Sequence, residues 1–184
     1  GYTCLSIIYS TYLKQLAILD VMTLSTLFCW RVITGGYVLG LEANIWFILS
    51  IGFIFLSLAF GKRYIELLKK SNNNSTSNNH IPGRGYRAKD ANFVMTGGVS
   101  SGFTSLVIIL IYLMLPLSKV ITSELAVISI IFLITFWFLR FWFLIAREKV
   151  NDDPIIFALK DLQSRFILFL VIFILFAEQI IFNI

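Results

Sequence analysis

The chain has 184 residues, of which 58% are hydrophobic and only 14% are charged, and its net charge is +5. Soluble domains usually carry about 25% charged residues and keep their apolar content below about half. Together with a mean hydropathy of +0.87, this composition excludes an ordinary soluble domain, and we expect no nucleic-acid partner. It favours an all-α membrane protein, a multi-span helical bundle that is solvated by a lipid bilayer.

Long apolar blocks predict the membrane-spanning helices in chain order. A spanning helix needs roughly 20 predominantly apolar residues. Five blocks come close to or exceed that length, namely residues 21–39, 43–61, 91–118, 125–146 and 166–184. Residues 1–13 are apolar but short, which predicts the end of a sixth span. Because the chain opens with Gly1 inside this block, we expect residues 1–184 to be one transmembrane bundle, the C-terminal part of a longer protein.

Basic residues gather on one side of the predicted bundle. If the spans alternate in direction, one face receives Lys14 and the loops 62–90 and 147–165, whereas Lys119 is the only cation in the loops of the opposite face. Positively charged loops remain in the cytoplasm. We therefore expect these loops to be cytoplasmic and the protein to lie in the cell (inner) membrane. Within the first loop, residues 71–80 lack apolar side chains, which predicts a flexible polar insert.

The first of these loops contains two segments suited to binding phosphate. At its start, Lys62, Arg63 and Glu66 lie within one turn if the preceding helix continues beyond the membrane. After the insert, residues 83–87 (Gly-Arg-Gly-Tyr-Arg) combine two arginines with glycines that let the backbone approach an anion closely. A phosphorylated ligand at the membrane surface accounts for both segments. The alternatives are an ion-paired helix end and a basic turn that contacts lipid headgroups.

The second loop contains two neighbouring aspartates, Asp152 and Asp153, directly before Pro154. Asp153 as the N-cap and Pro154 as the first helical residue explain this pattern without any ligand. The functional alternative is that one of the aspartates holds a divalent ion beside phosphate groups. The sequence leaves both interpretations open.

Two charged side chains are expected to line a cavity between the helices. Arg31 lies in the middle of a predicted span, where a cation is costly unless it faces the bundle interior. Asp20 precedes it by nearly three helical turns, so the two share a helix face about 16 Å apart. This spacing is too long for a direct pair, which favours one cavity with Asp20 near its mouth. Arg140, near the cytoplasmic end of its span, is expected to extend toward the membrane surface.

The order of several short motifs resembles the UbiA prenyltransferase superfamily, and within it the decaprenyl-phosphate phosphoribosyltransferases. The motifs are Tyr9-Ser10, Leu13-Lys14, Leu19-Asp20-Val21, Arg31, residues 62–67, residues 83–87, Asp152-Asp153-Pro154 and Phe157-Ala158. Each motif is short, and the resemblance comes from their order and spacing around the spans. Residues 62–67 stand roughly where other members carry a second aspartate-rich motif, which favours the phosphoribosyl branch.

The resemblance implies a nine-helix fold with a cavity that is open to the cytoplasmic leaflet. Members of this branch transfer 5-phosphoribose from phosphoribosyl diphosphate to a polyprenyl (decaprenyl) phosphate, with Mg²⁺, in cell-envelope biosynthesis. The first aspartate-rich motif of the superfamily is absent from these residues, so we expect the chain alone to be inactive. Alternative functions are a UbiA-type prenyltransferase with a polyprenyl diphosphate and an aromatic acceptor, or a noncatalytic membrane transporter or scaffold. The expected partners are the polyprenyl phosphate, phosphoribosyl diphosphate and the lipid bilayer, and a homo-oligomer is possible.

Carried over by position, the resemblance assigns roles to three groups of residues. The candidates for substrate phosphate binding are Lys14, Lys62, Arg63, Arg84, Tyr86 and Arg87. The candidates for metal or ribose contacts are Glu66, Asp90, Asp152 and Asp153. Asp20 and Arg31 are the cavity residues.

Overall fold

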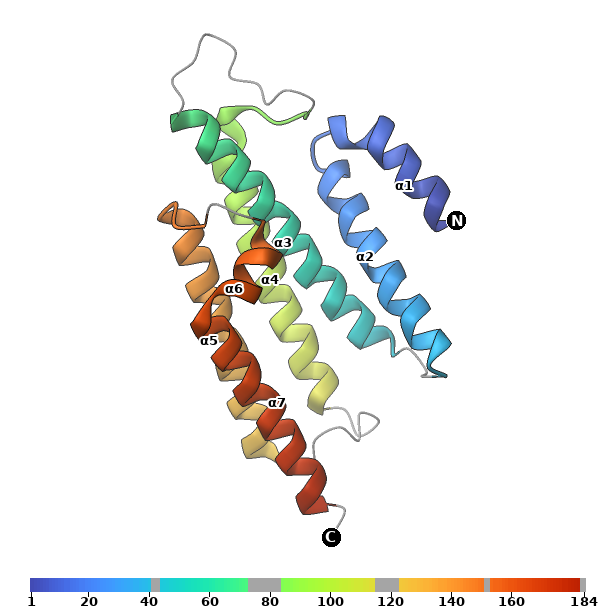
Figure 1. The fold of residues 1–184 in the computed structure, drawn as a ribbon, viewed down its shortest axis with the longest axis vertical. Helices are drawn as coiled ribbons and strands as arrows, with labels where there is room; N and C mark the ends of the chain where they lie inside the picture. The colour runs from blue at the N-terminus through green and yellow to red at the C-terminus, as the bar shows by residue number, and fades with distance from the viewer. Residues whose placement is uncertain (41–43, 73–83, 115–122, 151–152, 183–184) are drawn as a thin grey trace. The chain divides into compact units, whose positions relative to one another are not determined.

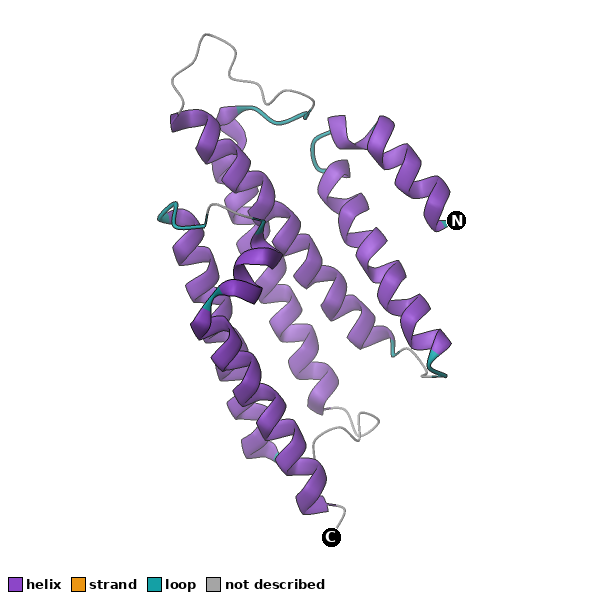
Figure 2. Ribbon diagram, viewed as in Figure 1, coloured by secondary structure: helices purple, strands orange, loops and turns teal. Residues whose placement is uncertain are grey.

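The computed structural model describes residues 1–40, 44–72, 84–114, 123–150 and 153–182. These residues form helices joined by loops, with no β-strand among them (Figure 2). Within the same ranges, four helical segments are long and apolar enough to cross a membrane: Ile45–Lys70, Ala88–Met114, Glu124–Ala146 and Leu162–Ile180. The predicted all-α membrane bundle is confirmed, and the chain is a multi-pass membrane protein.

The first compact unit, Gly1–Ser105, is built around three helices. Its elements are α1 (Tyr2–Thr11), the 3₁₀ helix η1 (Leu13–Gln15), α2 (Leu19–Val38), α3 (Ile45–Asn72), the 3₁₀ helix η2 (Ala88–Asp90) and the first part of α4 (Ala91–Met114). α1 and α3 both pack against α2, and α2 and α3 run side by side in opposite directions (Figure 1). This arrangement brings the start of α2 to the end of α3.

Small polar residues hold the helices of this unit close together. The Ser25 hydroxyl donates to the Gly52 carbonyl oxygen at 2.6 Å, and the Ser57 hydroxyl donates to that of Gly98 at 2.7 Å. The buried hydroxyls of Ser50 and Ser105 lie 3.0 Å apart. Small residues let helix backbones approach within a membrane, and bonds to carbonyl oxygens satisfy their hydroxyls. The register of α3 against α2 and α4 is thereby fixed.

The observed helices follow the predicted spans, with two differences. α3 continues past residue 61 to Asn72, so the expected extension that carries Lys62, Arg63 and Glu66 is present. α2 has 20 residues but is not one of the four apolar spans, so the membrane span predicted over residues 21–39 stays a prediction. The polar insert begins with the last residues of α3, and residues 73–80 of it lie outside the described part of the chain. The single bundle over residues 1–184 stays a prediction as well.

The second compact unit, Leu106–Ile184, pairs two long apolar helices. It contains the end of α4, then α5 (Glu124–Ala146), α6 (Pro154–Lys160) and α7 (Leu162–Phe182), with α7 packed on α5 and α6. Buried residues of α4 and α5 form a core: Leu113, Ala126, Val127 and Ile130. Large side chains such as Phe132 and Phe169 are exposed. Such exposure is expected where the surrounding solvent is lipid rather than water.

One polar cluster fixes the corner between α6 and α7 onto α5. The Arg140 guanidinium donates to both carboxylate oxygens of Asp161, at 2.7 and 2.9 Å. The Ser164 hydroxyl donates to Asp161 at 2.8 Å, and the Trp137 indole N–H donates to Ser164 at 3.0 Å. Arg140 thus has a carboxylate partner in the loop 147–165, and its extension to the membrane surface stays a prediction. α6 begins at Pro154, as the Asp-Pro pattern predicts.

Candidate functional site

A strained turn leads from η1 into α2 and sets the position of Asp20. Ile18 has φ +69° and ψ −51°, and the Leu19 N–H donates to the Ala17 carbonyl oxygen at 2.8 Å. These values define a classic γ-turn, which is rare and strained, above all for a β-branched residue. α2 begins immediately after the turn, so Asp20 lies in its first turn, where the helix dipole favours a carboxylate.

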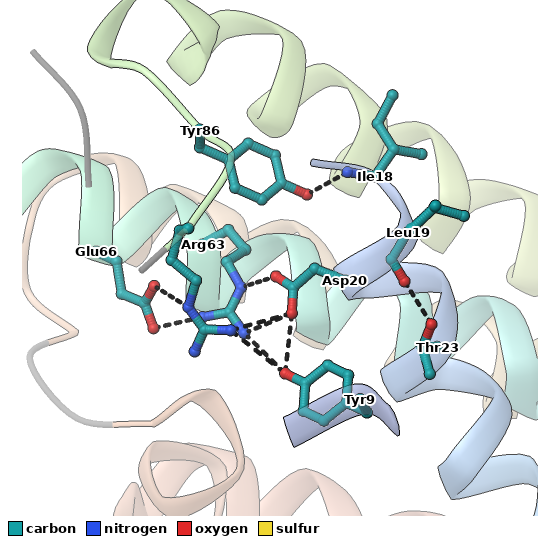
Figure 3. A network of polar contacts seen from close by, with 9 residues as sticks. Tyr9, Ile18, Leu19, Asp20, Thr23, Arg63, Glu66 and Tyr86 are labelled. Carbon is teal, nitrogen blue, oxygen red and sulfur yellow. Dashed lines mark hydrogen bonds and ion pairs between the residues drawn. The ribbon is translucent and has the colours of Figure 1, made fainter. Parts of the chain in front are cut away.

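Asp20 is a fully buried carboxylate that joins three segments of the first unit. The Tyr9 hydroxyl donates to its Oδ1 at 2.9 Å, and Arg63 contacts both of its oxygens, through Nε to Oδ2 and through Nη2 to Oδ1 (Figure 3). Arg84 Nη1 donates to Oδ1 at 3.1 Å. A buried charge needs such partners, because leaving water without them costs several kcal/mol. Asp20 therefore connects α1, α3 and the loop after the insert.

Arg63 is as buried as Asp20, with 1% of its side chain exposed. Its Nη1 donates to Glu66 Oε1 at 2.5 Å, three residues further along α3. Glu66 is partly exposed, and its Oε2 lies 3.8 Å from Nε of Arg84, whose side chain is 22% exposed. Arg63 is thus enclosed by two carboxylates. Arg84 and Glu66, by contrast, are partly exposed, and we call these two side chains the rim of the cluster, where a ligand can reach them.

Tyr86 is buried next to this cluster and holds the strained turn. Only 1% of it is exposed, and its hydroxyl oxygen accepts a hydrogen bond from the Ile18 N–H at 2.9 Å (Figure 3). Burial raises the pKa of the Tyr86 phenol above its usual value, so the neutral hydroxyl is favoured. Tyr86 is thus buried beside the cluster, and a contact between its hydroxyl and a phosphate stays a prediction.

The other candidate phosphate contacts lie on the same segments. Lys14 is in η1, Lys62 precedes Arg63 on α3, and both are partly exposed, whereas Arg87 follows Tyr86 and is exposed. Arg63 and Arg84 are paired with Asp20 and Glu66. In sequence, residues 62–90 contain seven basic and two acidic residues, and such an imbalance attracts anions. The arrangement can bind a phosphate or diphosphate group at Arg84 while its inner half stays neutral.

The two expected cavity residues, Asp20 and Arg31, have different partners. Arg31 is exposed on α2, and its Nε and Nη2 donate to the Tyr2 hydroxyl at 2.8 and 2.5 Å. Its guanidinium also lies over the Phe28 ring, 5.5 Å from the centroid. A hydroxyl from α1 and an aromatic face thus partner this cation. Asp20 pairs with Arg63 and Arg84 instead, and a cavity lined by both Asp20 and Arg31 stays a prediction.

The candidate metal ligands are occupied by other contacts or lie apart. Glu66 binds Arg63, and Asp90 Oδ2 accepts the backbone N–H of Arg87 at 2.8 Å. Asp153 precedes α6 in the second unit, and Asp152 lies outside the described residues. Across the part of the chain that the structure describes, no three histidine, cysteine or acidic side chains gather into a possible metal site. Mg²⁺ is usually bound through one or two carboxylates together with phosphates of the substrate, so magnesium binding stays a prediction.

Sequence reasoning missed two residues of the site. Tyr9 entered only as part of a motif, and its spacing of eleven residues from Asp20 gives no signal across a change of helix. Ile18 has no signal at all, because the sequence patterns for positive φ rely on glycine, asparagine and aspartate. Both became visible only once α1, α2 and the loop after the insert were placed together.

Comparisons with known proteins give one long match and one short match of particular interest. The chain is 34% identical over 168 residues to y4nM of Sinorhizobium fredii, described as uncharacterized, covering 90% of the chain and 32% of y4nM. It is 36% identical over 67 residues to the decaprenyl-phosphate phosphoribosyltransferase of Corynebacterium glutamicum, covering 36% of the chain and 20% of that protein.

A second long match is weaker in identity. Over 170 residues, the chain is 24% identical to the nodulation protein NoeC of Azorhizobium caulinodans, covering 89% of the chain and 53% of NoeC. The chain thus spans about a third of y4nM and about half of NoeC. No protein-family model matches the sequence.

Proposed function

We propose that the chain is part of a UbiA-type membrane transferase that moves 5-phosphoribose from phosphoribosyl diphosphate to a polyprenyl phosphate. The observation that carries this proposal is Arg84, a partly exposed guanidinium that is held against the buried Asp20. The local similarity to a decaprenyl-phosphate phosphoribosyltransferase supports it. The similarity to NoeC and y4nM along most of the chain is consistent with a shared membrane fold.

The proposed chemistry asks little of the protein except charge and position. A phosphate oxygen of the lipid attacks the anomeric carbon of the ribose, the bond from that carbon to the diphosphate oxygen breaks, and diphosphate leaves. Negative charge grows on the leaving group, so donors fixed beforehand stabilise the transition state more than the ground state. In the proposal Arg84 supplies such donors, and Lys14, Lys62 and Arg87 add charge around it.

We propose that the transfer requires Mg²⁺, and we assign no residue as its ligand. The described acidic residues form no cluster of three, and Glu66 already binds Arg63. In the proposal Mg²⁺ is bound mainly by the diphosphate, and Glu66, Asp90, Asp152 and Asp153 stay the candidates for a protein ligand. No step of the proposal runs through the metal. The proposed location is the cell (inner) membrane with the loops 62–90 and 147–165 in the cytoplasm.

A binding measurement with a matched control tests the site. Purified protein in detergent is titrated with phosphoribosyl diphosphate, with and without Mg²⁺, for the wild type, Arg84→Glu and Arg147→Glu. Arg147 is an exposed arginine of the second unit whose guanidinium lies over the Phe143 ring. We expect Arg84→Glu to weaken binding at least about tenfold, since a bidentate guanidinium–phosphate contact is lost and repulsion is added. Arg147→Glu should bind as the wild type does.

Three results would count against the proposal. Equal affinity of the wild type and Arg84→Glu would remove Arg84 from the binding site. If a folded wild type binds a prenyl diphosphate and an aromatic acceptor but not phosphoribosyl diphosphate, it is a prenyltransferase. If it binds none of these, a transporter or scaffold role remains.

A further inference from the structure

Two segments far apart in the chain meet along three successive contacts in the first unit. The backbone of Gly85 packs against residues 15–17, the Tyr86 hydroxyl oxygen accepts the Ile18 N–H, and Arg84 binds Asp20. Three consecutive residues, 84–86, thus all contact the short segment 15–20. The position of Arg84 therefore depends on a junction that extends beyond its own ion pair.

Gly85 shows how closely the junction is packed. A Cβ atom on this residue would lie 2.5 Å from the Ala17 nitrogen and 2.6 Å from the Gln15 carbonyl oxygen. Both distances are far below a normal contact, and both involve backbone atoms that cannot rotate away. Glycine is thus required by a close approach of two backbones. Any side chain at position 85 would push the loop, and with it Arg84, away from the start of α2.

Ile18 and Tyr86 form the centre of the junction. Backbone strain at a β-branched residue persists only where the surroundings hold it, and it is concentrated at functional sites. Here the hydroxyl oxygen of the buried Tyr86 satisfies the N–H of Ile18, a residue that is itself 48% exposed. The turn at Ile18 is followed by Asp20, which binds Arg63 (Figure 3). The same carboxylate also accepts a hydrogen bond from Arg84.

We infer that Tyr86 is a positioning residue: it holds the γ-turn at Ile18, and through that turn it fixes Asp20 and Arg84 for binding a phosphate or diphosphate group. Arg84 uses Nη1 for Asp20, and a guanidinium has five N–H donors, so donors remain for the anion. The inference rests on the proposed function only for the nature of the anion. The mechanical part, that Tyr86 controls Arg84, holds or fails without any ligand.

Chemical modification of arginine tests the mechanical part directly. Phenylglyoxal reacts with accessible guanidinium groups, and peptide mass spectrometry gives the rate at Arg84 in the full chain in detergent. The variants are Tyr86→Phe, which keeps the ring and loses the acceptor oxygen, and Gly85→Ala, which adds the clashing methyl group. The matched control is Tyr37→Phe, because Tyr37 is 84% exposed. Arg140, paired with Asp161 in the second unit, reports on unfolding.

We expect Arg84 to react about fivefold faster or more in both variants, the factor that one ordinary hydrogen bond contributes to an equilibrium. Arg140 should keep its rate, and Tyr37→Phe should change neither arginine. Unchanged Arg84 rates in both variants would overturn the inference. Faster modification of Arg140 in both variants would also contradict it, since the junction would then support the whole fold rather than Arg84.

Inorganic diphosphate in the same experiment separates this inference from the proposed function. If the site binds diphosphate, the probe slows modification of Arg84 in the wild type and slows it less in Tyr86→Phe. If both variants accelerate Arg84 but diphosphate never protects it, the positioning role of Tyr86 stands as a local effect and the anion site of the proposed function fails. If diphosphate protects the wild type and Tyr86→Phe equally, Tyr86 does not position Arg84 for the anion.

Discussion

At the scale of single residues, the first unit depends on a carboxylate that no water reaches. Asp20 accepts hydrogen bonds from Tyr9, Arg63 and Arg84, and only 1% of Arg63 is exposed, so water has little access to replace it. A buried pair of this kind contributes little compared with an apolar pair of the same volume, but removing one partner leaves the other charge uncompensated. Asp20 should therefore be far more sensitive to substitution than the partly exposed Glu66.

We expect Asp20→Asn to destabilise the protein by about 3–5 kcal/mol, because it removes the counter-charge of buried Arg63. Glu66→Gln, the matched control on the exposed side of Arg63, should cost about 1 kcal/mol or less. Thermal unfolding in detergent, followed by circular dichroism, measures both. Equal losses for the two variants would show that the burial of Asp20 does not set its importance.

A second expectation at this scale concerns the γ-turn. Glycine normally destabilises a protein relative to alanine, by about 0.5–1 kcal/mol, because the unfolded chain gains freedom. At Ile18, with φ +69°, the order should be reversed, since strain at positive φ is relieved in Ile18→Gly and kept in Ile18→Ala. Unfolding of the two variants gives the order directly. If Ile18→Ala is the more stable variant, the turn is not strained in solution.

At the scale of elements, one ion pair holds α6 and α7 to α5. Arg140 binds both oxygens of Asp161, and this contact lowers the pKa of the Asp161 carboxyl from 3.8 to about 2. Ser164 adds its backbone N–H and its hydroxyl to the same carboxylate. These contacts hold the corner between α6 and α7 against α5, a position that the sequence composition did not predict.

The stability of the second unit should depend on pH through Asp161. Because the folded pKa lies below the unfolded one, the contribution is fully present above about pH 4 and is lost as the pH falls toward 2. We expect the wild type to exceed Asp161→Asn by about 1–2 kcal/mol at pH 7, and the difference to shrink between pH 4 and pH 2. Unfolding of both proteins across this range measures it. A difference that stays constant with pH would contradict the assigned pKa.

At the scale of the whole molecule, the sequence predicted helices well and contacts between helices poorly. The apolar blocks 21–39 and 125–146 match α2 (Leu19–Val38) and α5 (Glu124–Ala146) within two residues. The match is close because a helix in a lipid environment needs a long run of apolar residues. Asp20 and Arg63, by contrast, are 43 positions apart. Helical periodicity relates residues of one helix only, so it associated Asp20 with Arg31 and could not find Arg63. Tyr86 was assigned to phosphate binding because of its motif. Only the structure shows that it is buried and that its hydroxyl oxygen accepts the Ile18 N–H.

The proposal as a whole is tested most directly by phosphoribosyl transfer in membranes from cells that express the complete reading frame containing these residues. Radiolabelled phosphoribosyl diphosphate is offered with polyprenyl phosphate, with and without Mg²⁺, to the wild type, Arg84→Glu and the control Arg147→Glu. We expect label to enter the organic phase with Mg²⁺ for the wild type and Arg147→Glu, and to fall at least about a hundredfold for Arg84→Glu, the size of effect typical for one lost charge-stabilising donor. Absence of transfer by the folded wild type, or full transfer by Arg84→Glu, would contradict the account.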